Sequence, residues 1–154
     1  TLSSSSAASD VYKRQILVLC TGNSCRSQMA HGYLKNMLAA EAKVYSAGVK
    51  KHGLNRDAVK VMGLDEVDIS DHTSNLVEDY LNIHFNYIIT VCDHANESCP
   101  IFPNKEAVKL HKNFTDPSKI EFENEQKKIE KFICVRNQIK TYCLDFANKF
   151  FPDR

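Results

Sequence analysis

Short apolar runs alternate with stretches in which apolar residues recur every three or four positions. The run at residues 16–19 is apolar throughout, and the run at 85–92 is rich in β-branched and aromatic residues, as buried strands are. Shorter patterns predict a strand at 43–48 and a weaker one at 107–114. The sequence therefore predicts four strands.

Helical spacing of apolar residues occupies the intervals between these strands. It predicts helices over residues 28–40, 55–62 and 76–81. Asn55 is a suitable N-cap and Gly63 a suitable stop for the second of these. Strands that alternate with helices favour βαβ crossovers, which produce a parallel sheet covered on both sides. We therefore predict an α/β fold with a four-stranded parallel sheet and helices on both faces.

The last predicted helix is the longest and covers residues 129–150. Its apolar side chains line one face. Cys134 and Cys143 are both helix residues in this prediction, and Cys143 lies on the apolar face. Arg136 interrupts that face, which suggests an edge position or an acidic partner.

The loop after the first strand combines a cysteine, small or polar residues and an arginine. Its sequence runs through Cys20, Thr21, Gly22, Asn23, Ser24, Cys25, Arg26 and Ser27. In a strand–loop–helix unit of this kind, the loop N–H groups and the positive end of the helix point at one spot, where an oxyanion can bind. Arg26 adds a planar fork of donors. The same field favours the thiolate of Cys20 beside the anion.

Cys20 alone among the six cysteines has an arginine six residues further on. A buried structural cysteine with a surface arginine is the alternative interpretation, and we favour the nucleophile. Ligands of parallel sheets bind beyond the carboxyl ends of the strands. Because Cys20 and Cys92 both lie at such ends, we expect them to be close together.

Length and composition indicate a single globular domain. The chain has 154 residues, of which 43% are hydrophobic and 25% charged, and its formal net charge is +1. The sequence has no long run of one charge and no apolar stretch of membrane-spanning length, so we expect neither nucleic-acid nor membrane binding. Residues 1–14 lack an initiating Met and resemble translated adapter sequence. We interpret them as a non-native or disordered leader before one domain at 15–154.

A second pair of cysteines follows the strand predicted at 85–92. Cys92 and Cys99 are seven residues apart, which on a helix is about two turns and too far for a disulfide unless the segment unwinds. The pair could instead be packing residues, an accident, or half a metal site with His94. The spacing is poor for zinc, and we predict no metal. Two cysteines in the anion-binding loop and no scaffold-like spacing favour a reactive-thiol enzyme of the reducing cytoplasm.

These motifs together resemble a known family. Cys-x5-Arg-Ser after the first strand is similar to the low-molecular-weight tyrosine phosphatases, and CTGNSCRSQMA at residues 20–30 resembles their thioredoxin-coupled arsenate reductase branch. The resemblance implies that Cys20 attacks arsenate, that Cys92 attacks the sulfur of Cys20 as arsenite departs, and that Cys99 resolves the disulfide. It also implies arsenate as the substrate, reduced thioredoxin as the electron donor and partner, and no bound cofactor.

The resemblance implies further roles around the loop. Asp116, in an Asp-Pro pair, would be the general acid, although an ordinary turn is an equal alternative from the residues alone. Ser27 would hydrogen-bond to Cys20, and Asn23 would brace the loop. Cys25 would lie under the loop or pair oxidatively with the nucleophile. The implied oxyanion-binding residues are Thr21, Gly22, Asn23, Ser24, Cys25, Arg26 and Ser27.

Some members of this branch hold potassium near the loop with an Asn, a Ser, a Thr and two acids. Asn23, Ser46 and Thr73 fit that pattern. His31 and Asn75 stand where the acids would be, so we predict no potassium activation. We expect surface or packing positions, without a catalytic role, for His31, His52 and His72.

Two other functions are compatible with the sequence. A phosphatase acting on phosphotyrosine would need only Cys20, Arg26 and Asp116. Phosphatases of this kind usually carry aromatic residues after Asp-Pro, where this chain has Ser118 and Lys119. Weak phosphatase activity is compatible with either enzyme, because phosphate and arsenate share shape and charge. A non-catalytic oxyanion sensor is the third alternative, and the intact set of nucleophile, arginine and acid argues against it.

Overall fold

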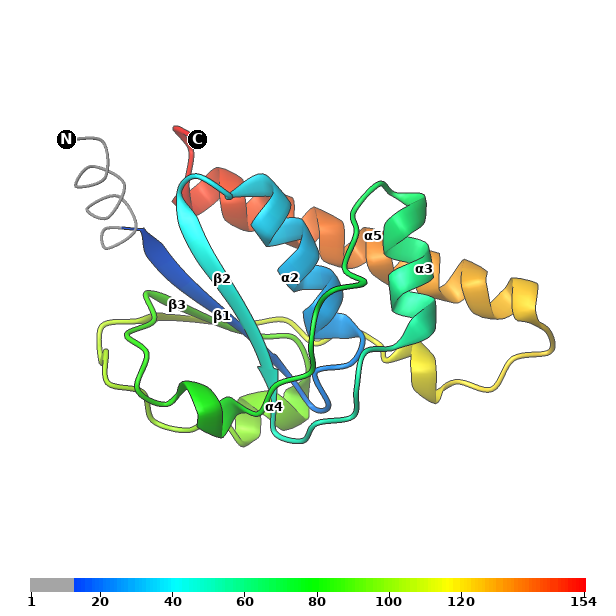
Figure 1. Cartoon of the computed structure of the whole chain (residues 1–154), viewed down its shortest axis with the longest axis horizontal. Helices are drawn as coiled ribbons and strands as arrows, with labels where there is room; N and C mark the ends of the chain where they lie inside the picture. The colour runs from blue at the N-terminus through cyan, green and yellow to red at the C-terminus, as the bar shows by residue number, and fades with distance from the viewer. Residues whose placement is uncertain (1–12) are drawn as a thin grey trace.

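The computed structural model describes residues 13–154, whose four strands form one parallel sheet (Figure 1). In the spatial order β2-β1-β3-β4, the strands are β1 (Arg14–Cys20), β2 (Ala42–Gly48), β3 (Tyr87–Thr90) and β4 (Val108–His111). The α-helices are α2 (Arg26–Met37), α3 (Arg56–Leu64), α4 (Asp93–Glu97) and α5 (Glu125–Phe150). Two 3-10 helices are η1 (Val77–Tyr80) and η2 (Pro117–Lys119). The predicted four-stranded α/β fold is confirmed.

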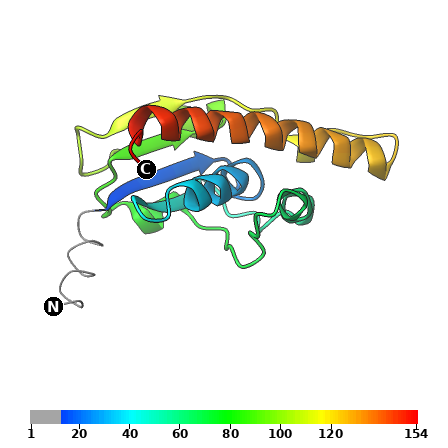
Figure 2. The same ribbon diagram turned by 90° about the horizontal axis from the view of Figure 1, so that it is seen from above.

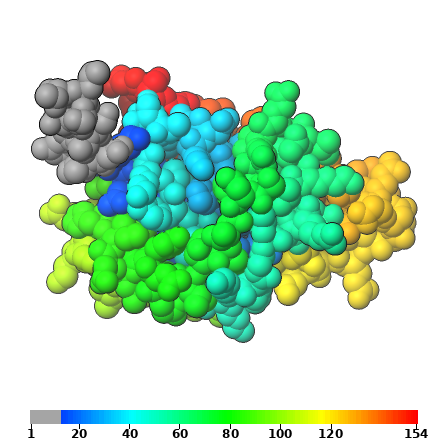
Figure 3. Space-filling view, in the orientation of Figure 1, coloured from blue at the N-terminus to red at the C-terminus, as the bar shows by residue number. Residues whose placement is uncertain are grey.

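Helices cover both faces of the sheet. α2 and α5 pack against each other on one face, as Figures 1 and 2 show. The other face carries α4 and η1, and edge-to-face ring contacts join the aromatic side chains of Tyr45, Tyr80, Phe85 and Phe102 there. The space-filling view shows little of β1 between its neighbours (Figure 3), and residues 16–19 are at most 1% exposed. This explains why that run is apolar at every position.

Several boundaries differ from the predicted ones. The predicted leader covers residues 1–14, of which residues 1–12 lie outside the described residues. Arg14 already belongs to β1, where it pairs with Ala42. The helix predicted at 76–81 is the single 3-10 turn η1. Gly63 was predicted to stop α3, and this is wrong, because the helix continues to Leu64. The Asn55 side chain does cap α3, accepting two backbone N–H groups at 2.9 Å.

Arg136 has a partner, but the partner is not an acid. Its Nη1 donates to the backbone oxygen of Val61 at 2.8 Å. Val61 lies in the last turn of α3, where the backbone carbonyl groups receive no hydrogen bond from within the helix. Arg136 therefore ties α5 to the carboxyl end of α3, which accounts for a charged residue on an otherwise apolar face.

Candidate active site

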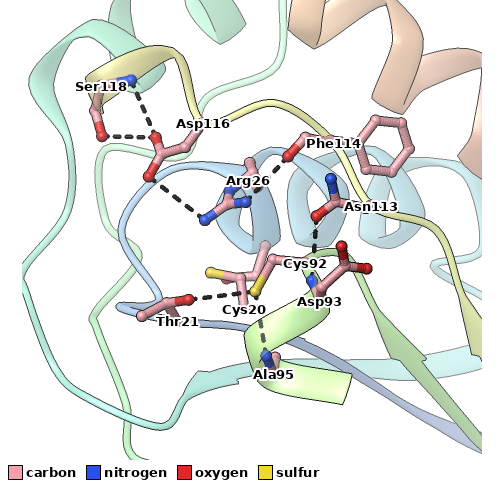
Figure 4. A network of polar contacts seen from close by, with 11 residues as sticks. Cys20, Thr21, Arg26, Cys92, Asp93, Ala95, Asn113, Phe114, Asp116 and Ser118 are labelled. Carbon is pink, nitrogen blue, oxygen red and sulfur yellow. Dashed lines mark hydrogen bonds and ion pairs between the residues drawn. The ribbon is translucent and has the colours of Figure 1, made fainter. Parts of the chain in front are cut away.

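A cavity of about 360 Å³ lies at the carboxyl ends of β1 and β3. The anion loop, residues 20–27, forms its floor and ends in the first turn of α2. The thiol segment, residues 92–100, follows β3 and contributes its first residues to the wall. The third part of the wall comes from residues 113–119, after β4. Parallel strands thus bring these three stretches, and His52 after β2, to one edge. Figure 4 shows the three stretches from close by.

Cys20 lies at the end of β1 with 2% of its surface exposed. Its Sγ is 2.9 Å from the Ser27 Oγ. Ser27 Oγ also accepts a hydrogen bond from the Asn23 Nδ2 at 2.8 Å, which leaves the Ser27 hydroxyl hydrogen available to the sulfur. A hydroxyl donor stabilises a thiolate. The predicted contact between Ser27 and Cys20 is present.

Asn23 holds the loop in a conformation that few residues adopt. Its φ is +47°, in the left-handed region that asparagine tolerates better than most residues, and its side chain is fully buried. Its Oδ1 accepts from the backbone N–H of Asn75 at 2.7 Å, and its backbone oxygen accepts from Ser74 Oγ at 2.9 Å and from Gln28 Nε2 at 3.0 Å. Gln28, Ser74 and Asn75 therefore hold both the side chain and the backbone of Asn23.

The backbone carbonyl groups of the loop point away from the cavity. Thr21, Gly22 and Ser24 accept, in that order, from the N–H groups of Lys50, His52 and Asn55 at 2.8, 3.0 and 3.0 Å. In a trans peptide the following N–H points the opposite way. Among the described residues, no protein acceptor takes the N–H groups of residues 22–25. These groups are the donors that an oxyanion needs.

Gly22 is required by a close approach from outside the loop. A Cβ at this position would lie 2.3 Å from the His52 Nδ1 and 2.7 Å from its Cγ. The imidazole of His52 therefore lies directly against the loop backbone, and it also borders the cavity. We predicted no catalytic role for His52, and the one sequence signal for its position is the glycine in the loop that it contacts.

Arg26 and Asp116 meet at the upper rim of the cavity in Figure 4. Arg26 Nη1 donates to the backbone oxygen of Phe114 at 3.0 Å, and its Nη2 is 3.4 Å from Asp116 Oδ2. The other carboxylate oxygen of Asp116 accepts from the N–H of Ser118 at 3.0 Å and from its hydroxyl at 2.6 Å. Asp116 is thus the N-cap of η2, with Pro117 next in the chain, and one oxygen stays directed toward Arg26 and the cavity.

Cys92 enters the same cavity from the opposite wall. It is the N-cap of α4, and its Sγ accepts from the N–H of Ala95 at 3.4 Å and lies 3.3 Å from the Thr21 Oγ1. Both cysteines line the cavity, and Figure 4 shows their sulfur atoms below the guanidinium of Arg26. The structure therefore brings Cys20, Cys92, Arg26 and Asp116 together, as the sequence predicted for the two strand ends.

Cys99 lies outside this group. It follows the end of α4, is half-buried, and has its Sγ 3.6 Å from the backbone oxygen of Pro100. Burial raises the pKa of its thiol, partly offset by the charge of Lys109. Cys25 lines the cavity, and burial, followed by the charge of Asp116, raises the pKa of its thiol well above the ordinary range. All six cysteines are free thiols.

Two histidines stack behind the anion loop. The rings of His31 and His72 are 4.4 Å apart, His31 Nδ1 is 2.8 Å from Ser46 Oγ, and His72 Nδ1 is 3.0 Å from the Gln28 Oε1. Burial, reinforced by the charges of His72 and Lys35, lowers the pKa of His31 to about 3. Both rings lie outside the cavity, in agreement with packing positions.

Several cavity residues have no clear signal in the sequence. They are His52, Asp93, His94, Asn113, Ser118 and Lys119. Asp93 and His94 follow Cys92 directly, and Ser118 and Lys119 follow the Asp116-Pro117 pair, whereas His52 and Asn113 come from segments that only the fold brings together. Among the described residues, no cluster of three or more His, Cys, Asp or Glu side chains could hold a metal ion. None of the helices in residues 13–154 combines the length and the apolar character needed to cross a membrane.

A buried thiol beneath a ring of free N–H groups, with an arginine and a carboxylate at the rim, defines a class of protein that can bind a tetrahedral oxyanion against a sulfur nucleophile. Residues 15–152 match the family described as low molecular weight phosphotyrosine protein phosphatase. The chain belongs to this family.

Close relatives within the family carry a different name. The arsenate reductase of Shouchella clausii is 43% identical over 135 residues, which are 88% of this chain and 96% of that protein. The arsenate reductase of Halalkalibacterium halodurans is 47% identical over 116 residues, which are 75% of this chain and 82% of that protein. A solved structure of an arsenate reductase in the phosphate binding state has a TM-score of 0.70 and 26% identity, covering 88% of this chain and 98% of that one.

Proposed function

We propose that this protein reduces arsenate to arsenite with three thiols in sequence, Cys20, Cys92 and Cys99, and that reduced thioredoxin restores them. The observation that carries the proposal is the second thiol, Cys92, in the cavity of the first. A phosphatase needs no second thiol, whereas a two-electron reduction needs two. Relatives named arsenate reductase, 43% and 47% identical, support the same assignment.

In the first step the Cys20 thiolate attacks the arsenic of arsenate. The free N–H groups of the anion loop and the guanidinium of Arg26 hold the remaining oxygens. Asp116 gives a proton to a hydroxyl group of the arsenate, so that this group departs as water. The product is a Cys20–arsenic thioester, and arsenic is still in the +5 state.

In the second step the Cys92 thiolate attacks the Sγ of Cys20. The electron pair of the sulfur–arsenic bond stays on arsenic, which becomes arsenite in the +3 state, and a Cys20–Cys92 disulfide forms. The two thiols together lose the two electrons that arsenic gains. The contact between Cys92 Sγ and the Thr21 Oγ1, at 3.3 Å, supports an approach from the side of the loop.

In the third step Cys99 attacks Cys92, and Cys20 leaves as a thiolate. The new Cys92–Cys99 disulfide requires α4 to unwind, because the helix separates the two residues. Thioredoxin then reduces this disulfide by thiol exchange. Since every step needs reduced thiols, we propose the cytoplasm as the compartment.

The test is arsenate-dependent NADPH oxidation, coupled through thioredoxin and thioredoxin reductase. We expect the variants Cys92→Ser and Cys99→Ser to lose multiple turnover. Cys99→Ser should still release one arsenite per chain and stop as the Cys20–Cys92 disulfide, whereas Cys92→Ser should release none. The exposed Cys134 on α5 provides the control, Cys134→Ser, which should turn over like the parent. Parent-like turnover by Cys92→Ser would exclude the relay.

Hydrolysis of phosphate esters is a second candidate, because Cys20, Arg26 and Asp116 would serve both reactions. The cavity wall argues for a weak side activity only. Its lining in the described residues includes Ser118 and Lys119 and no Phe, Tyr or Trp side chain to hold a phenyl ring. We propose slow hydrolysis of p-nitrophenyl phosphate that is unaffected by Cys99→Ser. Fast hydrolysis without any arsenate turnover would make the protein a phosphatase.

A further inference from the structure

The first residue of α4 is tied to the neighbouring strand by two bonds. Asp93, which directly follows Cys92, accepts a hydrogen bond from His111 Nε2 at its Oδ1, at 2.7 Å. Its backbone N–H donates to the Asn113 Oδ1 at 3.1 Å. His111 is the last residue of β4. The start of the thiol segment is therefore attached to β4 and to the chain that leaves it.

The ring of His111 is held from its other side as well. Its Nδ1 is 2.7 Å from Thr90 Oγ1, and Thr90 is the buried last residue of β3. Because the carboxylate of Asp93 accepts, Nε2 carries the hydrogen in this contact, and the Thr90 hydroxyl donates to Nδ1. Thr90 of β3 thus holds Nδ1 of the ring, and Nε2 is directed toward Asp93 of α4.

We propose that the Asp93–His111 contact positions Cys92 for attack and sets the free energy at which the thiol segment rearranges into its disulfide form. The inference rests on the proposed function and names two positioning residues for it. Neither residue touches the sulfur atoms, so both act through the placement of α4.

Formation of the Cys92–Cys99 disulfide requires the Asp93–His111 contact to break. Cys92 is the N-cap of α4, and Cys99 lies two residues beyond the last residue of this helix. The five helical residues between them rise about 7.5 Å, whereas the Cα atoms of a disulfide lie within roughly 7 Å. The other side-chain contacts of α4 are few: Ala95 is its one buried side chain, and Asn96 Oδ1 lies 3.5 Å from Thr90 Oγ1 of β3. Unwinding from Asp93 onward separates its carboxylate from His111. The contact consequently stabilises the reduced, helical form, and its loss should favour the disulfide.

The same contact also directs a negative charge. Asp93 lines the cavity that binds the anion, yet Figure 4 shows its carboxylate turned away from Cys20. His111 holds the carboxylate in that direction. Without the imidazole, the charge can turn toward the bound oxyanion and repel it. Removing His111 and removing Asp93 should therefore have different effects on arsenate binding.

The first experiment measures the Cys92–Cys99 equilibrium in glutathione redox buffers without arsenate. We expect Asp93→Ala and His111→Ala each to favour the disulfide about fivefold, which is roughly 20 mV more negative at about 30 mV per tenfold change. The double variant should shift no further than either single one, because one contact is lost in all three. Asp93→Asn, which keeps an acceptor, should recover part of the effect. Glu97→Ala is the matched control on the same helix, since the Glu97 side chain is exposed and has no hydrogen bond or ion pair to the described residues.

Kinetics separate the two residues. His111→Ala should raise the KM for arsenate about threefold through the freed carboxylate, whereas Asp93→Ala should leave the KM at or below the parent value. Unfolding midpoints close to the parent value in all variants would show that the fold is intact. Equal potentials in parent, Asp93→Ala and His111→Ala would overturn the proposal.

A labelling experiment keeps this inference separate from the relay. In a background with Cys20→Ser, Cys99→Ser and Cys134→Ser, alkylation of the buried Cys92 reports the opening of α4. Asp93→Ala should accelerate it several-fold, and an unchanged rate would count against the contact. If the parent forms no Cys92–Cys99 disulfide in any redox buffer, the relay fails, and the alkylation rate still decides whether the contact holds Cys92.

Discussion

The anion loop and the thiol segment both carry a cysteine into one cavity, but they are held very differently. Asn23 and Ser27 of the loop are fully buried, and the loop carbonyls accept bonds from residues 50–55 and from Ser74. The thiol segment contains a helix of five residues with one buried side chain, and Asp93 provides its main attachment to the sheet. The anion loop is held by hydrogen bonds on its side away from the cavity, which makes it the rigid wall of the site. The thiol segment is attached mainly at its first helical residue, Asp93.

This difference corresponds to two different tasks in the proposed reaction. Donors for an oxyanion are most effective when they need no reorganisation, so the loop benefits from being rigid. A thiol that must reach two partners in turn has to move, and a segment with few buried contacts opens at low cost. The predictions below test each half of this comparison.

The largest effect should come from the chemistry of the rigid wall. Cys20→Ser is expected to reduce arsenate turnover by at least about 1,000-fold, because a serine hydroxyl neither ionises near neutral pH nor forms a disulfide. Arsenate-dependent NADPH oxidation measures this. Cys134→Ser is the matched control. Retention of measurable multiple turnover by Cys20→Ser would place the nucleophile elsewhere.

Rigidity of the loop should appear as stability. Asn23→Ala removes the hydrogen bonds to Ser27 and from the N–H of Asn75 and puts alanine at a positive φ, so we expect a loss of about 3 kcal/mol in the free energy of unfolding. Urea denaturation measures it. Ser98→Ala, in the thiol segment, should cost less than about 0.5 kcal/mol, because Ser98 is exposed. Equal losses at the two positions would mean that the segments are held alike.

The same contrast explains what the sequence could reveal. The loop motif is contiguous, so Cys20 and Arg26 were predictable from order and spacing alone, whereas the contact of Ser27 with Cys20 was implied by the family resemblance. Asp116 could be placed only through a family resemblance, because an Asp-Pro pair forms a turn in any context. His52 and Asn113 were not predictable, since their positions depend on how separate loops fold against the cavity.

Tertiary contacts also account for the errors in the fold. The periodicity identified α5 but not the reason for Arg136, because a backbone carbonyl of α3 leaves no mark in the sequence. Gly63 resembles a helix stop, yet it is followed by one more helical residue. The Asp93–His111 contact joins residues that are far apart in sequence and belong to different elements. Local patterns specify local structure, and contacts between elements need the fold.

The histidine pair behind the loop should make the rigid wall sensitive to acid. The pKa of His31 is lowered from 6.5 to about 3, first by burial and then by the charges of His72 and Lys35. The folded protein therefore keeps a neutral ring that the unfolded chain protonates. The contribution of His31 to the free energy of unfolding is fully present above about pH 6.5. It is lost as the pH drops toward 3, with a slope of about 1.4 kcal/mol per pH unit for one proton.

The variant His31→Gln removes this titrating group. Its free energy of unfolding should change less between pH 7 and pH 4.5 than that of the parent, measured in urea at both values. Burial and the charge of Lys35 lower the pKa of His72 in the same direction, so part of the slope should persist. A parent slope that His31→Gln does not alter would show that the loop is not braced by a neutral imidazole.

The smallest expected effect is that of potassium. The side-chain oxygens that could bind potassium already take part in hydrogen bonds behind the anion loop. Asn23 Oδ1 accepts from the N–H of Asn75, Ser46 Oγ lies 2.8 Å from the His31 Nδ1, and Thr73 Oγ1 donates to the Asn75 Oδ1 at 3.2 Å. A hard cation prefers charged oxygen ligands, and the positions that would supply carboxylates hold His31 and Asn75. We therefore expect unchanged turnover when potassium replaces sodium at constant ionic strength.

A double variant makes this expectation sharper. His31→Glu with Asn75→Asp supplies two carboxylates beside Asn23, Ser46 and Thr73, and it should acquire a potassium-dependent gain in turnover and in unfolding midpoint that the parent lacks. Because the two new charges repel each other without a cation, the variant should also be less stable than the parent in sodium. Faster turnover of the parent in potassium would contradict this prediction. It would mean that the ion displaces the hydrogen bonds of Asn23, Ser46 and Thr73, and that the anion loop is less rigid than these contacts indicate.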